Sequence, residues 1–377
     1  MKLTVDTTSL MARLDKALLG LPPKKKESLP ITVMFLCEIE NEVMSITATD
    51  VERRIRVQLP VRSKDNFKFC APGRLLTNTI ELCREPETQF TLKVKDKSFV
   101  VEVKSGKNKY VLNGFDPEDF PRQSMSNCDS EITLQSSEFR KSLRMAENLV
   151  DKNEGREQLR GLHITEKNKN IEIVSATGFY LGKFRHSPRA IKSWAACTIT
   201  PAMAKMIREA FGDKEVIDVM HNGKMLFVKS DNTMVCGMLL DQKYPDTDPF
   251  FNNKEFDTET ELSTMEMLDA AKRLSLYSSD ESPYIDMVSV TGSPNEILVT
   301  AVDEAFGNSG EEVIHSSNVI NIDTRFNSKF VDSIISLIDE PTFKFFYSDT
   351  RKMAYICPTL TTDQELDREF VIMRIMK

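Results

Sequence analysis

The sequence predicts an α+β protein made of three similar modules, each with two helices on one face of an antiparallel sheet. Two observations predict this fold: a short phrase recurs about every 125 residues, and a strand followed by a helix recurs six times. Repetition at such a period is typical of a chain built from copies of one structural unit. The 377 residues are enough for three domains of ordinary size, which we expect at 1–126, 127–251 and 252–377.

The recurring phrase is an alternating apolar run that ends in a turn residue. Its copies are Ser45–Asp50, Ile173–Gly178 and Leu298–Asp303. Alternation of apolar and polar residues predicts a strand with one buried face. Asp50 and Asp303 end two of these strands, and turn capping explains them better than paired acid–base chemistry.

The helices are predicted from apolar residues spaced four apart, such as Phe139 and Leu143 or Met203 and Ile207. Thr200-Pro201 suits a helix start, with a capping hydroxyl followed by proline in the first turn. Short alternating runs between the helices predict hairpins, for example 90–94 with 98–103. We expect helices over 8–19, 73–84, 137–149, 201–211, 263–276 and 325–338.

Composition excludes several classes of protein. With 40% hydrophobic and 28% charged residues the chain resembles an ordinary folded protein. No apolar stretch approaches the roughly 20 residues of a membrane helix, and Met1–Leu10 does not resemble a signal peptide. Seven cysteines without a CxxC pair argue against a disulfide framework or a zinc site, and the four histidines are scattered. We therefore expect a cytoplasmic protein with no cofactor, no metal and no membrane partner.

The net charge is −7, but the expected helices carry 13 basic and 8 acidic residues, which leaves −12 for the rest of the chain. One interpretation is that the helices face a polyanion, because basic side chains bind phosphates without sequence preference. The other is that they carry Lys and Arg outward for solubility. The basic residues are Arg13, Lys16, Arg74, Arg84, Arg140, Lys141, Arg144, Lys205, Arg208, Lys272, Arg273, Arg325 and Lys329.

Pieces distributed over the whole chain resemble one known family, the bacterial DNA polymerase III beta subunit, a three-domain sliding clamp. The resemblance implies a head-to-tail homodimer that forms a ring of six similar domains, with helices lining a hole around duplex DNA and sheets outside. It implies a processivity factor with no catalytic site, which tethers DNA polymerase to its template. All the basic residues above except Arg84 would then face DNA. The matching pieces are Met1–Leu10, Leu29–Thr32, Ser45–Asp50, Phe69–Leu76, Phe115–Pro121, Leu159–Leu162, Ser175–Gly182, Lys243–Asp246 and Val371–Met373.

The resemblance also implies a hydrophobic groove between the second and third domains, which binds short peptides of polymerases, the clamp loader and repair proteins. The family usually has Thr-Asp-Gly-His-Arg-Leu where this chain has Ala176–Leu181, has proline in place of Arg374, and has an aromatic residue in place of Thr247. We therefore expect a different peptide preference and a divergent or accessory clamp. For Leu159 and Leu181, an ordinary core role is an open alternative. The matching positions are Arg156, Leu159, Ala176, Gly178, Phe179, Tyr180, Leu181, Pro245, Phe250, Val371, Met373 and Ile375.

For the dimer seam, the resemblance implies that Tyr110 and Leu112 on an edge strand of the first domain lie opposite Leu276 and Tyr277 of the third. Pairing across the seam would satisfy strand edges that are otherwise exposed, and a closed ring needs the right rotation between domains. Alternatively, Tyr110 and Leu112 pack under their own sheet.

Two other functions remain open. One is a protein–protein interaction scaffold that keeps the fold without being loaded on DNA. The other is a metal-dependent enzyme, although the sequence has no GxSxG, Walker or GxGxxG motif. An acidic run near the end of the chain could bind a cation, but a solvated loop before the last strand is the favoured interpretation. The run consists of Asp363, Glu365, Asp367 and Glu369.

Overall fold

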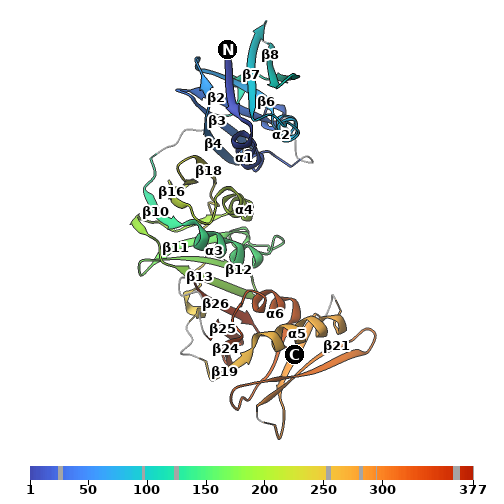
Figure 1. Cartoon of the computed structure of the whole chain (residues 1–377). Coiled ribbons are helices and arrows are strands. Elements are labelled where there is room, and N and C mark those ends of the chain that lie inside the picture. The colour runs from blue at the N-terminus through green and yellow to red at the C-terminus, as the bar shows by residue number, and fades with distance from the viewer. Residues whose placement is uncertain are drawn as a thin grey trace. The chain divides into compact units, whose positions relative to one another are not determined.

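The structure is a computed structural model that describes residues 1–23, 29–95, 98–122, 127–251, 256–279, 283–293, 295–359 and 366–376. Figure 1 labels the helices and strands along the chain. Packing divides the chain into two compact units. Unit 1 comprises 1–140, 189–195 and 202–239, and unit 2 comprises 141–188, 196–201 and 240–377. The expected domain boundaries near 126 and 252 lie at the edge of or outside the described residues, so the three-domain division stays a prediction.

Unit 1 contains two antiparallel sheets. The five-stranded sheet has the order β5-β1-β7-β8-β9, formed by Arg62–Ser63, Lys2–Asp6, Glu87–Lys95, Ser98–Ser105 and Asn108–Gly114. The nine-stranded sheet has the order β14-β10-β16-β17-β18-β4-β3-β2-β6. Its strands are Ala190–Ser193, Ser130–Gln135, Val216–His221, Met225–Lys229, Thr233–Met238, Arg53–Pro60, Val43–Thr49, Met34–Glu40 and Phe67–Pro72.

Unit 2 also contains two antiparallel sheets. The four-stranded sheet has the order β22-β21-β20-β23, formed by Asn308–His315, Glu296–Asp303, Tyr284–Ser289 and Asp323–Asn327. The eight-stranded sheet has the order β15-β11-β12-β13-β26-β25-β24-β19. Its strands are Cys197–Ile199, Leu162–Lys167, Asn170–Ala176, Tyr180–His186, Leu366–Met373, Met353–Pro358, Thr342–Ser348 and Thr258–Ser263.

The two long sheets share one plan. The order β6-β2-β3-β4-β18-β17-β16-β10 in unit 1 matches β15-β11-β12-β13-β26-β25-β24-β19 in unit 2. In each, a strand from one part of the chain pairs with a strand from a later part, β4 with β18 and β13 with β26. The shared plan confirms the α+β fold built from a repeated module.

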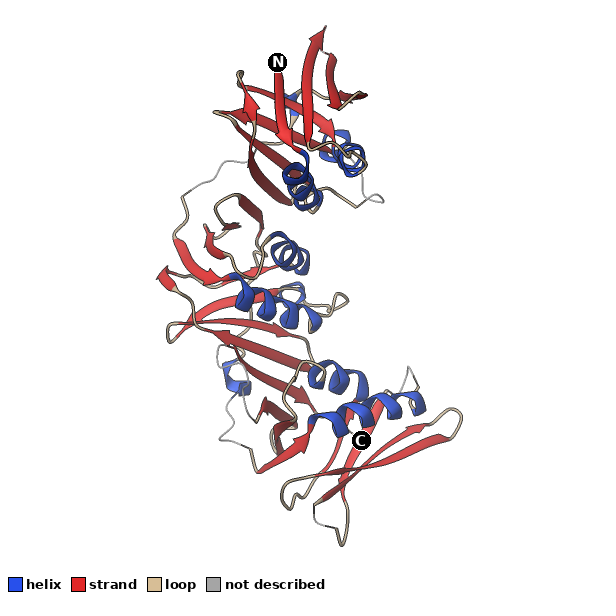
Figure 2. Cartoon of the chain, viewed as in Figure 1, coloured by secondary structure: helices blue, strands red, loops and turns tan. Residues whose placement is uncertain are grey.

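All six predicted helices form, at α1 Thr7–Leu18, α2 Gly73–Glu81, α3 Ser136–Asn148, α4 Pro201–Ala210, α5 Thr264–Leu274 and α6 Ser328–Ile335. Asp6 caps α1 by accepting a hydrogen bond from the Ser9 amide at 2.7 Å, and Asn327 caps α6 in the same way. Leu10, Leu14, Phe139, Leu143 and Met203 are fully buried, as their spacing predicts. Figure 2 shows the helices lying across the strands, with α5 and α6 packed together.

Three predicted helix ends are wrong by three residues: the end of the second helix, and both the start and the end of the last, which spans Ser328–Ile335. The second helix ends at Glu81, so Arg84 lies in the turn before β7. The last helix was expected to begin at 325, but 323–327 pairs with β20 as strand β23. Arg325 therefore belongs to a strand, where its guanidinium pairs with Asp286 at 2.8 Å. Backbone pairing to a distant segment outweighed the local helical pattern there.

The recurring phrase forms β3, β12 and β21, which confirms the repeat. Its alignment is wrong by one residue in the second copy. Ala48 packs against Gly20 beyond α1, and Ala301 faces Gly310, which lies against Leu274 of α5. The residue of the second copy that faces a helix is Ser175, whose hydroxyl donates to Ala146 O at 2.7 Å, and Ala176 faces the opposite side.

The acidic run before the last strand is also placed differently from the prediction. Asp367 and Glu369 lie within β26 and pair with Arg185 at 2.7 and 3.4 Å, rather than in a solvated loop. Asp363 and Glu365 lie outside the described residues. Among the helices of the described chain, none has the length and apolar character needed to cross a membrane.

Candidate DNA-facing helices and peptide groove

Five of the predicted DNA-facing side chains are exposed on helices. Arg144 lies on α3, Lys205 on α4, Lys272 and Arg273 on α5, and Lys329 on α6. Arg273 is the most firmly held of these, with its guanidinium paired to Glu312 at 2.6 Å. Lys205 lies 3.8 Å from Glu209 one turn later. Exposed ion pairs of this kind are weak, so the side chains can exchange their partners for another anion.

The other predicted basic residues are held by neighbouring groups of their own unit. Arg13 Nε donates to Gln58 O at 3.0 Å, and Lys16 Nζ lies 3.6 Å from Glu215. Arg74 donates to Pro22 O at 2.6 Å, and Arg140 donates to Arg208 O and pairs with Asp213. Lys141 and Arg208 are half-buried on α3 and α4. A role in holding their own unit together therefore explains these residues at least as well as a contact with DNA.

The corrected helix ends reduce the positive charge on the helices. As they form, the six helices carry 11 basic and 8 acidic residues, a net charge of +3 rather than the expected +5. Because the whole chain carries −7, the helices still differ in sign from the rest of the protein.

Six of the twelve predicted groove residues meet in one apolar cluster of unit 2. Leu159, Ala176, Leu181 and Val371 are buried there, and Phe250 and Met373 are partly buried against them. They come from β12, β13, β26 and two short 3-10 turns, η4 Glu157–Arg160 and η5 Asp248–Phe251. Residues distant in the sequence thus form one surface because β13 pairs with β26 in this register.

The rim of this cluster is the turn between β12 and β13. Phe179 is 55% exposed, and its ring stacks on the ring of Phe330 with 5.7 Å between the ring centres. Tyr180 is buried against the same Phe330 ring, with 4.8 Å between the ring centres. Met373 donates its amide to Phe179 O at 2.7 Å, which ties the end of β26 to this turn. Pro245 is exposed, and Ile375 is half-buried, with its amide donating to Arg325 O at 2.9 Å.

Arg156 and Gly178 are joined at the rim by Glu154. The Glu154 carboxylate accepts from Arg156 Nε at 3.0 Å and from the Gly178 amide at 3.1 Å. The Arg156 hydrogen bond lowers the pKa of Glu154 to about 2. The exposed guanidinium of Arg156 is therefore placed beside the groove as one half of an ion pair.

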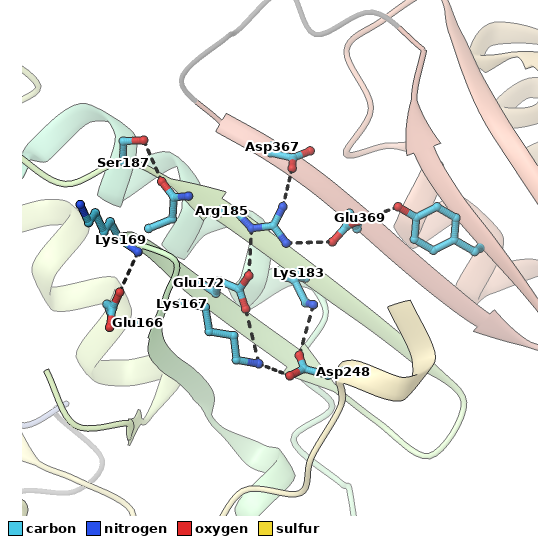
Figure 3. Close-up of polar contacts among 12 residues, drawn as sticks. Glu166, Lys167, Lys169, Glu172, Lys183, Arg185, Ser187, Asp248, Asp367 and Glu369 are labelled. Atoms are coloured by element: carbon cyan, nitrogen blue, oxygen red, sulfur yellow. Dashed lines mark hydrogen bonds and ion pairs between the residues drawn. The ribbon is translucent and has the colours of Figure 1, made fainter. Parts of the chain in front are cut away.

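A polar network lies on the same sheet face beyond the apolar cluster (Figure 3). Arg185 pairs with Glu172 at 2.9 Å as well as with Asp367 and Glu369. Lys167 and Lys183 both contact Asp248, and the Lys183 ammonium lies 4.0 Å from the Phe251 ring centre. The network connects η5 to β11, β13 and β26, so it holds the strands that form the groove.

The sequence did not identify several large members of the cluster as groove residues, although Tyr244 lies inside Lys243–Asp246, a piece that carried the family resemblance. The strand residues among them have only the alternation of any buried strand, which does not reveal the face they line. Leu159 and Leu181 are buried, so both interpretations made from the sequence apply to them. The missed members are Val174, Tyr244, Phe251, Phe346, Met353 and Tyr355.

The predicted seam residues differ in exposure. Leu112 is 3% exposed and packs within its own unit, as the alternative interpretation expects, whereas Tyr110 is partly exposed. Leu276 is 81% exposed and Tyr277 is also exposed, on the short turn η7 Ser275–Tyr277 after α5. β9 and β22 each end a described sheet with one side unpaired. These edges could pair with another chain.

The described part of the chain contains no group of three or more His, Cys, Asp and Glu side chains placed to bind a metal. Burial raises the pKa of Cys70 to about 12 and that of Cys236 to about 11, so these thiols stay protonated near neutral pH. The described surface carries exposed cations on the helices, an apolar cluster with an exposed rim, and strand edges without a partner strand.

Comparisons with known proteins identify the class more closely. Residues 1–125 match the family model of the DNA polymerase III beta subunit, N-terminal domain. The beta sliding clamp of Staphylococcus aureus (strain Mu50) is 20% identical over 371 residues, which are 95% of this chain and 96% of that one. The beta sliding clamp of Chlamydia muridarum is 24% identical over 276 residues, 72% of this chain and 73% of that one.

Solved structures share the fold over the whole chain. The DNA polymerase sliding clamp of Pseudomonas aeruginosa superposes with a TM-score of 0.88 at 16% identity, with full coverage of both chains. The Helicobacter pylori beta clamp bound to a DNA ligase peptide gives a TM-score of 0.84 at 16% identity, again with full coverage of both chains.

The chain therefore has the fold of the bacterial sliding clamps. The resemblance to the bacterial DNA polymerase III beta subunit, predicted from the sequence, is confirmed, and these relatives support the predicted sliding-clamp function.

Proposed function

We propose that this protein is a DNA sliding clamp: two copies form a ring around duplex DNA and tether DNA polymerase for processive replication in the cytoplasm. The observation that carries the proposal is the repeated module itself, in which paired amphipathic helices on antiparallel sheet hold exposed Arg and Lys side chains. In this proposal the three modules are 1–126, 127–251 and 252–377, and the two copies join head to tail.

The charge on the helices suits a ring that moves along DNA. Contacts of Lys and Arg with phosphates give affinity for DNA without sequence preference. Each contact also releases counterions from the DNA, which increases the affinity. A net charge of only +3 on the helices provides weak contacts, which allow sliding. The protein would act by topology and by binding partners, without a catalytic site, metal or cofactor of its own.

The DNA contact is tested with the variant Arg144→Glu/Lys205→Glu/Lys272→Glu, which reverses three exposed helix charges. After loading on nicked circular DNA, we expect this variant to be retained several-fold less than the unaltered protein and to remain a dimer. The matched control is Lys64→Glu/Lys169→Glu/Lys224→Glu. It makes the same charge change at exposed turn residues and should be retained normally.

Equal retention of the two triple variants would contradict the DNA-facing role of the helices. If neither variant nor the unaltered protein is retained, while partner peptides still bind, the scaffold function becomes the better description. Both interpretations use the same groove, so DNA retention is the measurement that separates them.

We further propose that the apolar cluster of unit 2 is the peptide site for the polymerase, the clamp loader and other clamp-binding proteins. Its support is the combination of a buried apolar floor with an exposed rim at Arg156, Phe179 and Pro245. Apolar grooves with a few polar groups at the rim suit short linear peptides.

The groove is tested with Phe179→Ser and with Phe306→Ser as matched control, because both rings are exposed but Phe306 lies in the turn between β21 and β22. The probe is the DNA ligase peptide that binds the Helicobacter pylori clamp. We expect Phe179→Ser to weaken peptide binding about tenfold, as loss of one aromatic anchor does. Equal affinity for both variants would remove Phe179 from the site.

A further inference from the structure

A cavity in unit 1 has a different chemistry from the apolar cluster of unit 2. It has a volume of about 380 Å³ and lies on the nine-stranded sheet. Ile55, between the two arginines of its floor, packs against Gly20 beyond α1. Because strand neighbours point to opposite faces, Arg54 and Arg56 lie on the face away from α1. We call this site the Arg54 cavity.

The Arg54 cavity is rich in cations. Its described lining contains four basic residues, Arg54, Arg56, Lys68 and Arg122, and a single acidic one, Glu38. Lys68 and Arg122 are both paired with Glu118, which is outside the lining. The remaining excess of positive charge is carried by the two arginines of β4.

The two guanidinium groups are held in place but are not fully satisfied. Arg54 donates to Pro121 O and lies 5.9 Å from the Phe120 ring centre. Arg56 donates to Ser45 Oγ at 3.0 Å, and Glu38 is 4.0 Å away. The Nε atom of each arginine is buried and has no hydrogen-bond partner among the described residues. A buried donor without a partner is unfavourable, and an anion would relieve that cost.

The corresponding place in unit 2 shows what is missing in unit 1. In the strand register, Arg56 of β4 lies directly opposite Met234 of β18. Lys183 of β13 has the same position in the repeated sheet plan, and it lies directly opposite Glu369 of β26. In unit 2 the basic residues of this face have four carboxylates as partners, at positions 172, 248, 367 and 369. In unit 1, Met234 takes the sheet position that Glu369 has in unit 2. The positive charge of Arg56 therefore lacks that carboxylate and can bind another anion.

Apart from Thr47, the rest of the described lining is apolar, and it favours one kind of anion. Phe227, Met234 and Cys236 lie beside the arginines, and Pro117, Phe120 and Pro121 cover one side. A multiply charged phosphate would lie close to the Glu38 carboxylate, which opposes it, whereas a single carboxylate matches a guanidinium pair. The Glu38 carboxylate could in turn accept a backbone N–H from a peptide.

We propose that the Arg54 cavity binds an acidic peptide segment of a partner protein, with one carboxylate held by Arg54 and Arg56 and the next apolar side chain against Phe227 and Met234. The site needs neither the ring nor DNA, so it stands apart from the function proposed above.

The test uses the full chain labelled with ¹³C-methyl methionine, without DNA. The probe is the peptide acetyl-Gly-Asp-Phe-Gly-amide. Met234 reports on the Arg54 cavity and Met373 on the groove of unit 2, each assigned with a Met→Leu variant. We expect the Met234 methyl signal to shift on titration and the Met373 signal to stay. The same peptide with Asn in place of Asp should bind at least about tenfold more weakly, because its charge-assisted hydrogen bonds are lost.

The variant Arg54→Gln/Arg56→Gln should weaken binding by at least about tenfold, consistent with loss of hydrogen bonds to a charged group. The matched control is Arg62→Gln, which removes one positive charge at an exposed arginine of β5. This variant should bind the peptide as tightly as the unaltered protein does. If the double variant does not fold, Arg56→Gln alone serves, because that side chain is 39% exposed.

Three results would overturn the proposal. They are a Met234 signal that does not move at millimolar peptide, equal shifts with the Asp and Asn peptides, and displacement of the peptide by an equal concentration of sodium phosphate. The last would identify a simple anion site rather than a peptide site.

Discussion

At the residue scale, the most demanding site is a buried charge in unit 2. Arg368 and Glu340 are each 1% exposed, and the guanidinium contacts the Glu340 carboxylate. It also donates to Leu337 O at 3.1 Å and lies 3.2 Å from Asp339. Removing these charges from water is costly, and each charge is tolerated only because the other is present.

We predict that Arg368→Met lowers the free energy of unfolding by about 3–5 kcal/mol, because it leaves the Glu340 carboxylate buried without its partner. The double variant Arg368→Met/Glu340→Leu should be clearly more stable than the single one. Urea unfolding measures both, with Arg189→Met, an exposed residue, as the control. A double variant as unstable as the single one would show that packing, not charge, holds the site.

The second residue-scale prediction concerns pH. Burial lowers the pKa of His163 and of His186 from 6.5 to about 4, so both imidazoles are neutral in the folded protein near pH 6. The unfolded chain then binds more protons between about pH 4 and pH 6.5, and stability rises with pH in that window. Their contribution is complete above pH 6.5 and is lost as the pH falls toward 4.

The variant His163→Gln/His186→Gln should therefore show a smaller slope of unfolding free energy against pH between 4.5 and 6.5, each histidine accounting for at most about 3 kcal/mol. Urea unfolding at several pH values measures this slope. His315, which is exposed, provides the control His315→Gln. An unchanged slope in the double variant would assign the pH dependence to other groups.

At the element scale, the packing of the segment after α3 against the sheet of unit 2 depends on a glycine. A Cβ atom at Gly182 of β13 would lie 2.2 Å from Leu149 Cδ1, just after α3. A side chain there would force the buried Leu149 side chain to shift, and overpacking of this kind typically costs 1–3 kcal/mol.

We predict that Gly182→Ala destabilises the protein by about 1–3 kcal/mol and that adding Leu149→Ala recovers part of the loss, because the two side chains compete for one space. Thermal unfolding of both single variants and the double variant gives the coupling. Gly155→Ala, where a Cβ atom would meet nothing within 4 Å, serves as the control. Strictly additive effects would refute the steric explanation.

The elements also show where local patterns are sufficient. All six helices were predicted because each has an apolar stripe at helical spacing. The wrong start of the last helix and the one-residue error in the second phrase share a physical origin. Both depend on the partner strand of a segment and on its register with that strand, β20 for Asp323–Asn327 and β13 for Asn170–Ala176. Register is a property of two segments, so one segment alone does not reveal it.

At the scale of the whole molecule, the proposed ring predicts a mass near twice 43.0 kDa in solution. We expect Leu276→Asp/Tyr277→Asp to give the monomer mass, since both side chains are exposed in the single chain and lie at the proposed seam. Light scattering after gel filtration measures the mass, and Met238→Asp/Met265→Asp, two exposed residues elsewhere, should remain dimeric. A dimer that survives the first variant would place the seam on another surface.

The groove illustrates the limit of sequence reasoning for this molecule. Leu159, Leu181, Val371 and Met373 were named from the resemblance, and the structure brings them together. Tyr244 and Phe346 belong to the same surface but were not named. A strand residue shows by its period that it is buried, whereas which face it lines depends on its partners across the sheet.

The amino-acid sequence by itself determined the repeated module, the six helices and the resemblance to a bacterial sliding clamp, because periodicity and short pieces in a fixed order are local properties. Only the tertiary structure decided that Arg325 is a strand residue, that Arg13 and Arg140 are held by their own unit, and that two arginines of β4 share a cavity with a single acid. Those facts depend on pairing between distant strands, and long-range pairing is set by the packing of the whole sheet rather than by any one segment.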